Sequence, residues 1–125
     1  MRLVRERDGA VVAERLELAD SFLRRLRGLM GRRALPAGRG LWLEPCASIH
    51  MMFVPFAIDV LWVARSAARP LGVGARAEVL EVHPAVRPWL GAAWCRGASG
   101  AIELAAGRAE GLALAPGDLL SVEAA

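Results

Sequence analysis

The chain of 125 residues contains two cysteines, no lysine and no apolar stretch long enough to cross a membrane. Without a secretion signal, two cysteines such as Cys46 and Cys95 are typical of free thiols and not of a structural disulfide. The longest apolar run, residues 49–64, is shorter than the roughly 20 residues of a membrane-spanning helix, and Pro55 and Asp59 interrupt it. These absences argue against a disulfide-built secreted scaffold and against a helical membrane protein.

The amino-terminal segment also lacks the pattern of an export signal. Residues 1–20 mix acidic and basic side chains throughout, whereas a signal peptide combines a basic start, an apolar stretch and a small-residue cleavage site. We therefore expect a protein that is not exported and that works in the cytoplasm. The length and the apolar content of 55% fit a single domain with one core.

The sequence has few side chains that could bind a metal ion and no complete motif for a nucleotide cofactor. A structural zinc site needs four ligands. The chain has four thiol or imidazole side chains, so all of them would have to be used: Cys46, His50, His83 and Cys95. Eleven residues separate His83 from Cys95, which is not a usual spacing for paired zinc ligands. The segment GVGAR, residues 72–76, lacks the third glycine and the following helix of a dinucleotide-binding fingerprint. The sequence predicts no metal site and no cofactor.

All 16 basic side chains are arginines, and 13 acidic residues leave a net charge of +3. Residues 1–40 carry ten arginines and five acids, whereas residues 41–125 carry six and eight. Many of the early arginines lie on the polar side of one predicted helix and in the loop after it, where a solvated face is the simplest interpretation. No segment shows the alternating aromatic residues of common RNA-binding sheets. We expect at most weak, salt-sensitive binding to acidic partners and no sequence-specific binding to nucleic acid.

Hydrophobic periodicity predicts mainly strands. Residues 3–19 contain the turn dipeptide Asp8-Gly9 between apolar positions, which indicates a hairpin. Further strands are expected at residues 41–45, 56–64, 77–84, 100–107 and 119–124. Residues 108–114 fit a helical turn or a strand, residues 65–70 a turn or loop, and residues 85–99 contain too many breakers for a regular element. Pro116 and Gly117 fit the central positions of a type II turn.

One helix is predicted over residues 20–32. Its apolar side chains recur at helical spacing: Phe22, Leu23, Leu26, Leu29 and Met30. Asp20 or Ser21 can cap its start and Gly31 can end it. Gly28 costs a helix about 1 kcal/mol relative to alanine, so we expect a close packing contact at this position. The whole pattern predicts a mainly β, compact sandwich or barrel-like single domain with one short amphipathic helix.

Asp59 lies in the most strand-like run of the chain. Strand alternation places its carboxylate on the same face as Leu61 and Val63, which should be dry. A buried carboxylate needs a cation or several N–H donors, and an arginine of the helix or His50 could supply the positive charge. The first interpretation is a structural carboxylate that holds a loop or a helix terminus, and the second is a catalytic or ligand-binding one.

Cys46, Ser48 and His50 alternate strictly, so in an extended segment their side chains point to one side. A Cys–His or Ser–His pair could support nucleophilic chemistry if a carboxylate oriented the base. Alternate positions of one strand are roughly 6.5–7 Å apart at the backbone, however, which is long for a nucleophile–base hydrogen bond. The pattern therefore favours a binding site over a catalytic one.

Four segments stand in a recognisable order: RLRGLMGR (25–32), GLWLEPCASIHMMFVPFAIDVLWV (40–63), AIELAAG (101–107) and GLALAPGDLL (111–120). Together they resemble the bacterial and archaeal family called domain of unknown function 192, and the resemblance extends from Ala19 to Leu120. It implies a compact, mainly β fold and no established activity. The family pattern marks these residues: Arg27, Gly28, Leu29, Met30, Cys46, Ser48, Ile49, His50, Asp59, Gly107, Gly117 and Asp118.

The sequence departs from that family pattern directly after His50. Met51 and Met52 stand where the family usually has threonine and an aromatic residue, and Ala57 stands where it has proline. Residues 54–55 are Val-Pro where Met-Arg is common. Because that arginine is missing, Arg27 becomes the expected partner of Asp59.

These patterns predict a ligand-binding site formed by Cys46, Ser48, His50, Asp59 and Arg27. Asp59, His50 and Arg27 are expected to form a buried polar clamp at its edge. We expect a binding module for a small polar ligand or a protein partner, and a hydrolase-type enzyme that uses His50 and Asp59 is the alternative. The sequence predicts neither a full set of catalytic residues nor an oligomeric state.

Overall fold

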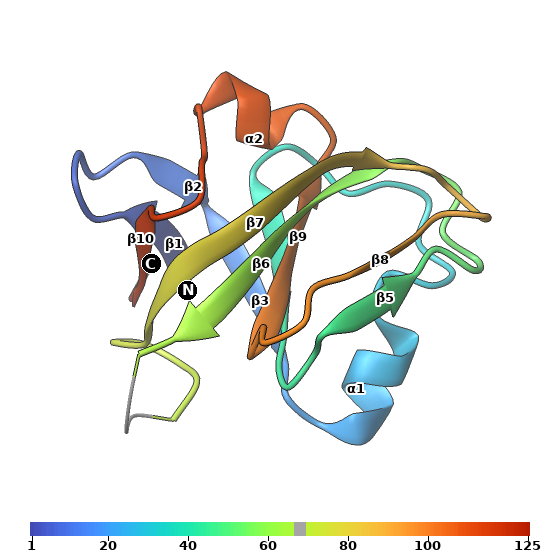
Figure 1. Ribbon diagram of the computed structural model, residues 1–125, viewed down its shortest axis with the longest axis horizontal. Coiled ribbons are helices and arrows are strands. Elements are labelled where there is room, and N and C mark those ends of the chain that lie inside the picture. Colours follow the sequence, from blue (N-terminus) through green and yellow to red (C-terminus); the bar gives the residue numbers. More distant parts are fainter. Residues whose placement is uncertain (67–69) are drawn as a thin grey trace.

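The computed structural model describes residues 1–66 and 70–125 (Figure 1). Within these residues the mainly β fold is confirmed. The elements are β1 (Arg2–Arg5), β2 (Val11–Ala13), β3 (Arg15–Ala19), α1 (Phe22–Arg27), β4 (Arg39–Leu43), β5 (Ser48–His50), β6 (Ile58–Arg65), β7 (Arg76–Val86), β8 (Ala92–Trp94), β9 (Gly100–Ala105), α2 (Arg108–Gly111) and β10 (Leu119–Glu123).

A large mixed sheet forms the body of the protein. Its eight strands follow the order β2-β1-β10-β7-β6-β9-β4-β3, and β3 pairs with β4 in parallel whereas the other neighbours are antiparallel. The two edge strands, β2 and β3, are consecutive in the chain, and the backbone N–H of Leu16 donates to the carbonyl of Met1 at 2.8 Å. The sheet therefore curls until its edges meet, which gives the predicted barrel-like form.

Two apolar cores lie on opposite faces of this sheet. The inner core takes side chains from all eight strands and includes Ala109 of α2. The outer core lies between the strands β3, β4, β6 and β9 and a covering layer to which β8 and the segments after α1 contribute. Strand β6 divides its side chains between the cores, with Leu61 in the inner one and Trp62 in the outer one. The prediction of a strand buried on both faces is confirmed.

The second sheet was not expected from the sequence. Residues 85–99 are rich in breakers, yet β8 forms there and pairs antiparallel with β5, with Ser48 opposite Trp94 and His50 opposite Ala92. Strand β7 also continues past Pro84 to Val86. Pairing with a distant segment stabilised strands that the local sequence disfavours. Of the predicted loop at residues 65–70, residues 67–69 lie outside the described part of the chain.

Two predicted turns are confirmed. The hairpin of β1 and β2 turns at Asp8 and Gly9, where Gly9 has a φ of +71° and the N–H of Arg5 donates to the carbonyl of Ala10 at 2.9 Å. The second turn has Gly117 at a φ of +93°, and the N–H of Asp118 donates to the carbonyl of Ala115 at 3.1 Å. A positive φ at the third residue is the mark of a type II turn.

Helix α1 is shorter than the sequence predicted. The Ser21 hydroxyl accepts a hydrogen bond from the N–H of Arg24 at 3.2 Å, as expected of the N-cap, but the helix ends at Gly28 and not at Gly31. Gly28 has a φ of +46°, and a Cβ there would meet its nearest neighbours only at 3.7 Å or more. The expected close packing contact is therefore wrong: this position requires glycine because of its backbone conformation.

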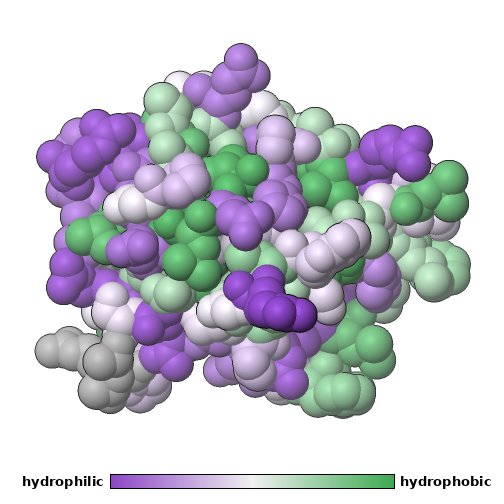
Figure 2. Space-filling model, viewed as in Figure 1, coloured by the Kyte–Doolittle hydropathy of each residue, from purple (hydrophilic) through white to green (hydrophobic). Residues whose placement is uncertain are grey.

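The apolar side of α1 faces solvent. Phe22 is 69% exposed, Leu23 74% and Leu26 53%, and the helix buries none of its residues. Leu29, which follows the helix, is buried in the outer core. Figure 2 shows apolar side chains gathered at the lower right of the view, where Figure 1 places α1. Neither described helix is long and apolar enough to span a membrane.

Candidate functional site

A cavity of about 370 Å³ lies between α1 and the segment that leads into β5, and we call it the apolar cavity. Its walls are mainly apolar: Phe22, Leu26, Leu29, Met30, Leu43, Ile49 and Val54. Its polar lining residues are Arg25, Arg27, Cys46, Ser48, His50 and Glu103. The structure thus brings together four of the five site residues predicted from the sequence. Concave apolar sites with a few convergent polar groups are the usual form of small-molecule sites.

Glu103 is the buried acid of this cavity. It lies in β9, where its cross-strand neighbours are Leu41 of β4 and Val60 of β6, both buried. Only 6% of the residue is exposed, and its carboxyl forms no hydrogen bond or ion pair with any residue that the structure describes. Burial raises the pKa of Glu103 from 4.5 to about 7, against a smaller lowering by the charge of Arg32.

Gly28 is a neighbour of this carboxyl. A side chain at position 28 would begin 3.9 Å from Oε1 of Glu103. The positive φ that ends α1 therefore also brings a residue without a side chain next to the acid. Gly28 and Glu103 both line the apolar cavity, so the carboxyl is accessible from it.

Cys46 is half-buried at the start of the β5 segment. Its thiol donates to the carbonyl of Ser48 at 3.2 Å. Burial raises the pKa of the thiol and the negative charge of Glu103 raises it further, whereas a backbone hydrogen bond at Ser48 and the charge of Arg25 lower it by less. The neutral thiol is a weak nucleophile, so Cys46 fits the wall of a binding site better than a catalytic centre.

His50 and Ser48 are exposed on β5. The Nδ1 atom of His50 accepts a hydrogen bond from the N–H of Met52 at 3.2 Å, which leaves Nε2 directed away from this turn. The predicted alternation is therefore realised: Cys46, Ser48 and His50 line one cavity. None of the hydrogen bonds that the structure describes joins the thiol or the hydroxyl to the imidazole.

Arg27 lies on the rim that the apolar cavity shares with a second, basic cavity of about 440 Å³. The basic cavity is lined by Glu17, Leu18, Ala19, Arg24, Arg27, Gly28, Arg32 and Leu41. Arg32 forms an ion pair with Glu17, with 2.8 Å between Nη2 and Oε2. Arg24 and Arg27 are exposed, and their guanidinium groups have no ion pair or hydrogen bond with a side chain in residues 1–66 or 70–125.

Asp59 lies outside both cavities. Its Oδ1 accepts a hydrogen bond from the N–H of Ala85 at 2.9 Å, and its Oδ2 accepts one from the N–H of Ala109 at 2.9 Å. The predicted clamp with Arg27 and His50 is therefore wrong. The carboxylate, 1% exposed, is on the predicted face beside the inner core and is satisfied by backbone N–H donors. It holds the first turn of α2 against the end of β7.

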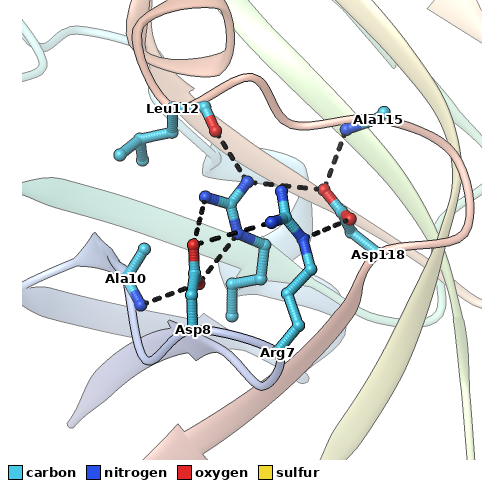
Figure 3. Close-up of polar contacts among 7 residues, drawn as sticks. Arg7, Asp8, Ala10, Leu112, Ala115 and Asp118 are labelled. Carbon is cyan, nitrogen blue, oxygen red and sulfur yellow. Dashed lines mark hydrogen bonds and ion pairs between the residues drawn. The ribbon is translucent and has the colours of Figure 1, made fainter.

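Asp118, another residue of the family pattern, is structural. Figure 3 shows Asp118 accepting a hydrogen bond from the N–H of Ala115, at 3.0 Å, with Arg7 beside it. The side chain of Asp8 accepts from the N–H of Ala10 in the same view, at 3.1 Å. Buried Arg5 contacts both carboxylates. This cluster joins the β1–β2 turn to the turn before β10, far from the apolar cavity in the fold.

A thiol, a carboxylate and an imidazole also meet beyond the cavities. The Cys95 thiol donates to Oε2 of Glu81 at 3.1 Å, and Oε1 of Glu81 is 2.9 Å from Nε2 of His83. The indole N–H of Trp62 donates to Nδ1 of His83 at 3.2 Å. Burial, together with Glu81, raises the pKa of Cys95 to about 11. This thiol is buried and protonated, so the cluster ties β6, β7 and the end of β8 together.

Sequence reasoning missed Glu103, although a signal was present. Residues 101–105 read Ala-Ile-Glu-Leu-Ala. Apart from Glu103, the side chains on both faces of this strand are apolar. A strand buried on both faces leaves no exposed face for a charged side chain. The same argument that identified Asp59 would have identified Glu103.

Comparison with known proteins identifies the family of the chain and two structures with the same fold. The family model DUF192, described as "Uncharacterized ACR", matches residues 3–122. The chain belongs to the DUF192 family. Two solved structures share the fold of this DUF192 domain. A protein of unknown function from Novosphingobium aromaticivorans has a TM-score of 0.76 at 20% identity, with coverage of 98% of this chain and 84% of that one. The "putative transcription regulator" from Sinorhizobium meliloti has a TM-score of 0.74 at 24% identity, with coverage of 96% and 89%.

These two likenesses are evidence for the fold alone, because both identities are low. The search among curated proteins gave no significant match. The family itself is uncharacterised, as the resemblance of the four segments implied.

Proposed function

We propose that this DUF192 domain is a small-molecule binding module and that its ligand enters the apolar cavity. The ligand has an apolar body and a cationic or hydrogen-bond-donating group that pairs with Glu103. The observation that carries the proposal is the buried carboxyl of Glu103, which lines the cavity and has no partner among the described residues.

The carboxyl of Glu103 is buried between strands β4 and β6. The carboxyl is reached from the cavity, and its burial makes the charged form costly there. A ligand donor would remove that cost, and a charged donor would also form a hydrogen bond roughly twice as strong as a neutral one. A folded protein that keeps such a group in a cavity gains affinity for a complementary ligand at the expense of its own stability.

The walls of the cavity support a ligand with an apolar body. Phe22 and Leu26 are exposed on α1 and both line the cavity. A ligand between α1 and β5 would cover part of this surface, and removing apolar area from water is favourable by about 25 cal/mol per Å². Of the two partners expected from the sequence, a small ligand suits this concave site better than a protein does.

The hydrolase alternative finds less support. His50 and Asp59 lie on different parts of the fold, with Asp59 held by Ala85 and Ala109. The thiol of Cys46 is neutral because burial raises its pKa. The proposal places the domain in a reducing compartment such as the cytoplasm, in keeping with Cys46 and Cys95 as free thiols.

Hexylamine tests the proposal, because it combines an ammonium group with an unbranched apolar chain. Calorimetric titration should detect binding to the wild type near neutral pH and a loss of about tenfold or more in affinity for Glu103→Gln. Glu110→Gln is the matched control, because Glu110 is exposed on α2 and lines neither cavity. Absence of binding, or equal binding by wild type and Glu103→Gln, would overturn the proposal.

A further inference from the structure

We infer that the ligand of the apolar cavity is a zwitterion: a carboxylate at its other end is bound by Arg24 and Arg27 in the basic cavity. The ligand class is an unbranched amino acid whose amino and acid groups are separated by several methylenes. This inference rests on the proposed function, since the amino end is the group that pairs with Glu103.

The first observation is the charge of the basic cavity. Its lining includes three arginines, Arg24, Arg27 and Arg32, against one acid, Glu17, which leaves two positive charges. Glu17 is already engaged by Arg32 through two hydrogen bonds, at 2.8 and 3.3 Å. The excess charge therefore belongs to Arg24 and Arg27, which have no described partner.

The second observation is the geometry of α1. Arg24 and Arg27 are three residues apart on the helix, a spacing that puts both side chains on one face. Both line the basic cavity. Two guanidinium groups on one side of a cavity can hold one carboxylate between them, and a guanidinium presents paired N–H donors that match the two carboxylate oxygens.

The third observation is that the cavities adjoin. Arg27 and Gly28 line both of them. Gly28 has no side chain to separate the two spaces, and a Cβ atom at this position would lie 3.9 Å from Oε1 of Glu103. A chain molecule can therefore reach from the carboxyl of Glu103 past Gly28 to the arginines.

Electrostatics explains why a second charge on the ligand should strengthen its binding. A simple amine that approaches Glu103 also approaches the positive rim formed by Arg25 and Arg27. The unfavourable interaction with this rim offsets part of its attraction to the acid. A carboxylate at the outer end turns the same rim into an attractive one, so the zwitterion matches the sign of the charge at both ends of the site.

The experiment compares γ-aminobutyrate, δ-aminovalerate and ε-aminocaproate with the alkylamines of the same chain lengths by calorimetric titration. We expect at least one amino acid to bind roughly tenfold more tightly than its alkylamine. The double variant Arg24→Ala/Arg27→Ala should lose this gain, whereas its affinity for the alkylamine should not fall, because the variant removes positive charge from the rim. Arg33→Ala is the control, because it removes one positive charge from an exposed residue outside both cavities.

Each outcome is decisive. Alkylamine binding that depends on Glu103, with no gain from a carboxylate at any chain length, would overturn this inference and leave the proposed function intact. A gain that survives in Arg24→Ala/Arg27→Ala would also overturn it. If neither the amino acids nor the alkylamines bind in a way that depends on Glu103, both this inference and the proposed function are overturned. Circular dichroism checks that the double variant folds, and Arg27→Gln, which removes the charge but keeps a polar side chain, gives a second measure of the same gain.

Discussion

Replacing Glu103 by glutamine should make the protein more stable at alkaline pH and leave it unchanged at acidic pH. Burial raises the pKa of this carboxyl from 4.5 to about 7. The folded protein therefore holds the proton more tightly than the unfolded chain does. The stabilisation is complete below about pH 4.5 and is lost as the pH rises through about 7, where the folded protein must ionise a buried group.

The magnitude follows from the two pKa values. Each pKa unit corresponds to about 1.4 kcal/mol, so the gap between 4.5 and about 7 amounts to about 3 kcal/mol of unfolding free energy. Glutamine imitates the protonated carboxyl and cannot ionise. The difference in stability between Glu103→Gln and the wild type should therefore grow from near zero at about pH 4 to about 3 kcal/mol at about pH 8.5.

Urea unfolding at a series of pH values measures this difference. Tryptophan fluorescence reports the transition, because Trp42 and Trp62 are fully buried. Other titrating groups contribute to both proteins and cancel in the comparison. Glu110→Gln, at an exposed position, should show no such pH-dependent difference. A constant difference between Glu103→Gln and wild type across the pH range would refute the reasoning, because it would mean that the carboxyl titrates alike in both states.

Three further predictions concern the interpretation of single residues. Asp59→Ala should cost about 2–5 kcal/mol in urea unfolding because it leaves two backbone N–H donors without an acceptor; a wild-type midpoint would contradict this. Leu29→Ala should cost about 2–5 kcal/mol and Leu23→Ala less than about 0.5, since Leu29 is 2% exposed and Leu23 74%; equal costs would mean that α1 packs differently. Cys46 should react slowly with iodoacetamide at neutral pH. It should react faster in Glu103→Gln, because this variant removes a negative charge that raises the pKa of the thiol. An unchanged rate would show that Glu103 does not influence the thiol.

The prediction of the helix shows the limit of local periodicity. The spacing of Phe22, Leu23 and Leu26 indicates an amphipathic helix, and α1 forms where expected. Periodicity assigns these side chains to one face but not to a core. Here the outer core is covered by Leu29 and by segments around β5 and β8, so the helix leaves its apolar side to solvent and to the cavity.

The sequence by itself determined the features that depend on neighbouring residues. Alternation and β-branched content located most strands, and the Pro116-Gly117 pair set its turn because proline and glycine fix the backbone angles locally. Alternation also placed Asp59 on a dry face, next to the inner core. The requirement that a buried carboxylate find several donors followed from chemistry alone.

Only the tertiary structure decided which groups meet. The donors to Asp59 are 26 and 50 residues away along the chain, in a bulge of β7 and at the start of α2. Strand β8 exists because β5 pairs with it, although its own sequence is rich in breakers. Glu103 lies beside Gly28 because β9 pairs with β4 and α1 ends above that pair. Long-range strand pairing sets these distances, and a local pattern carries no information about them because it reports only which face a side chain occupies.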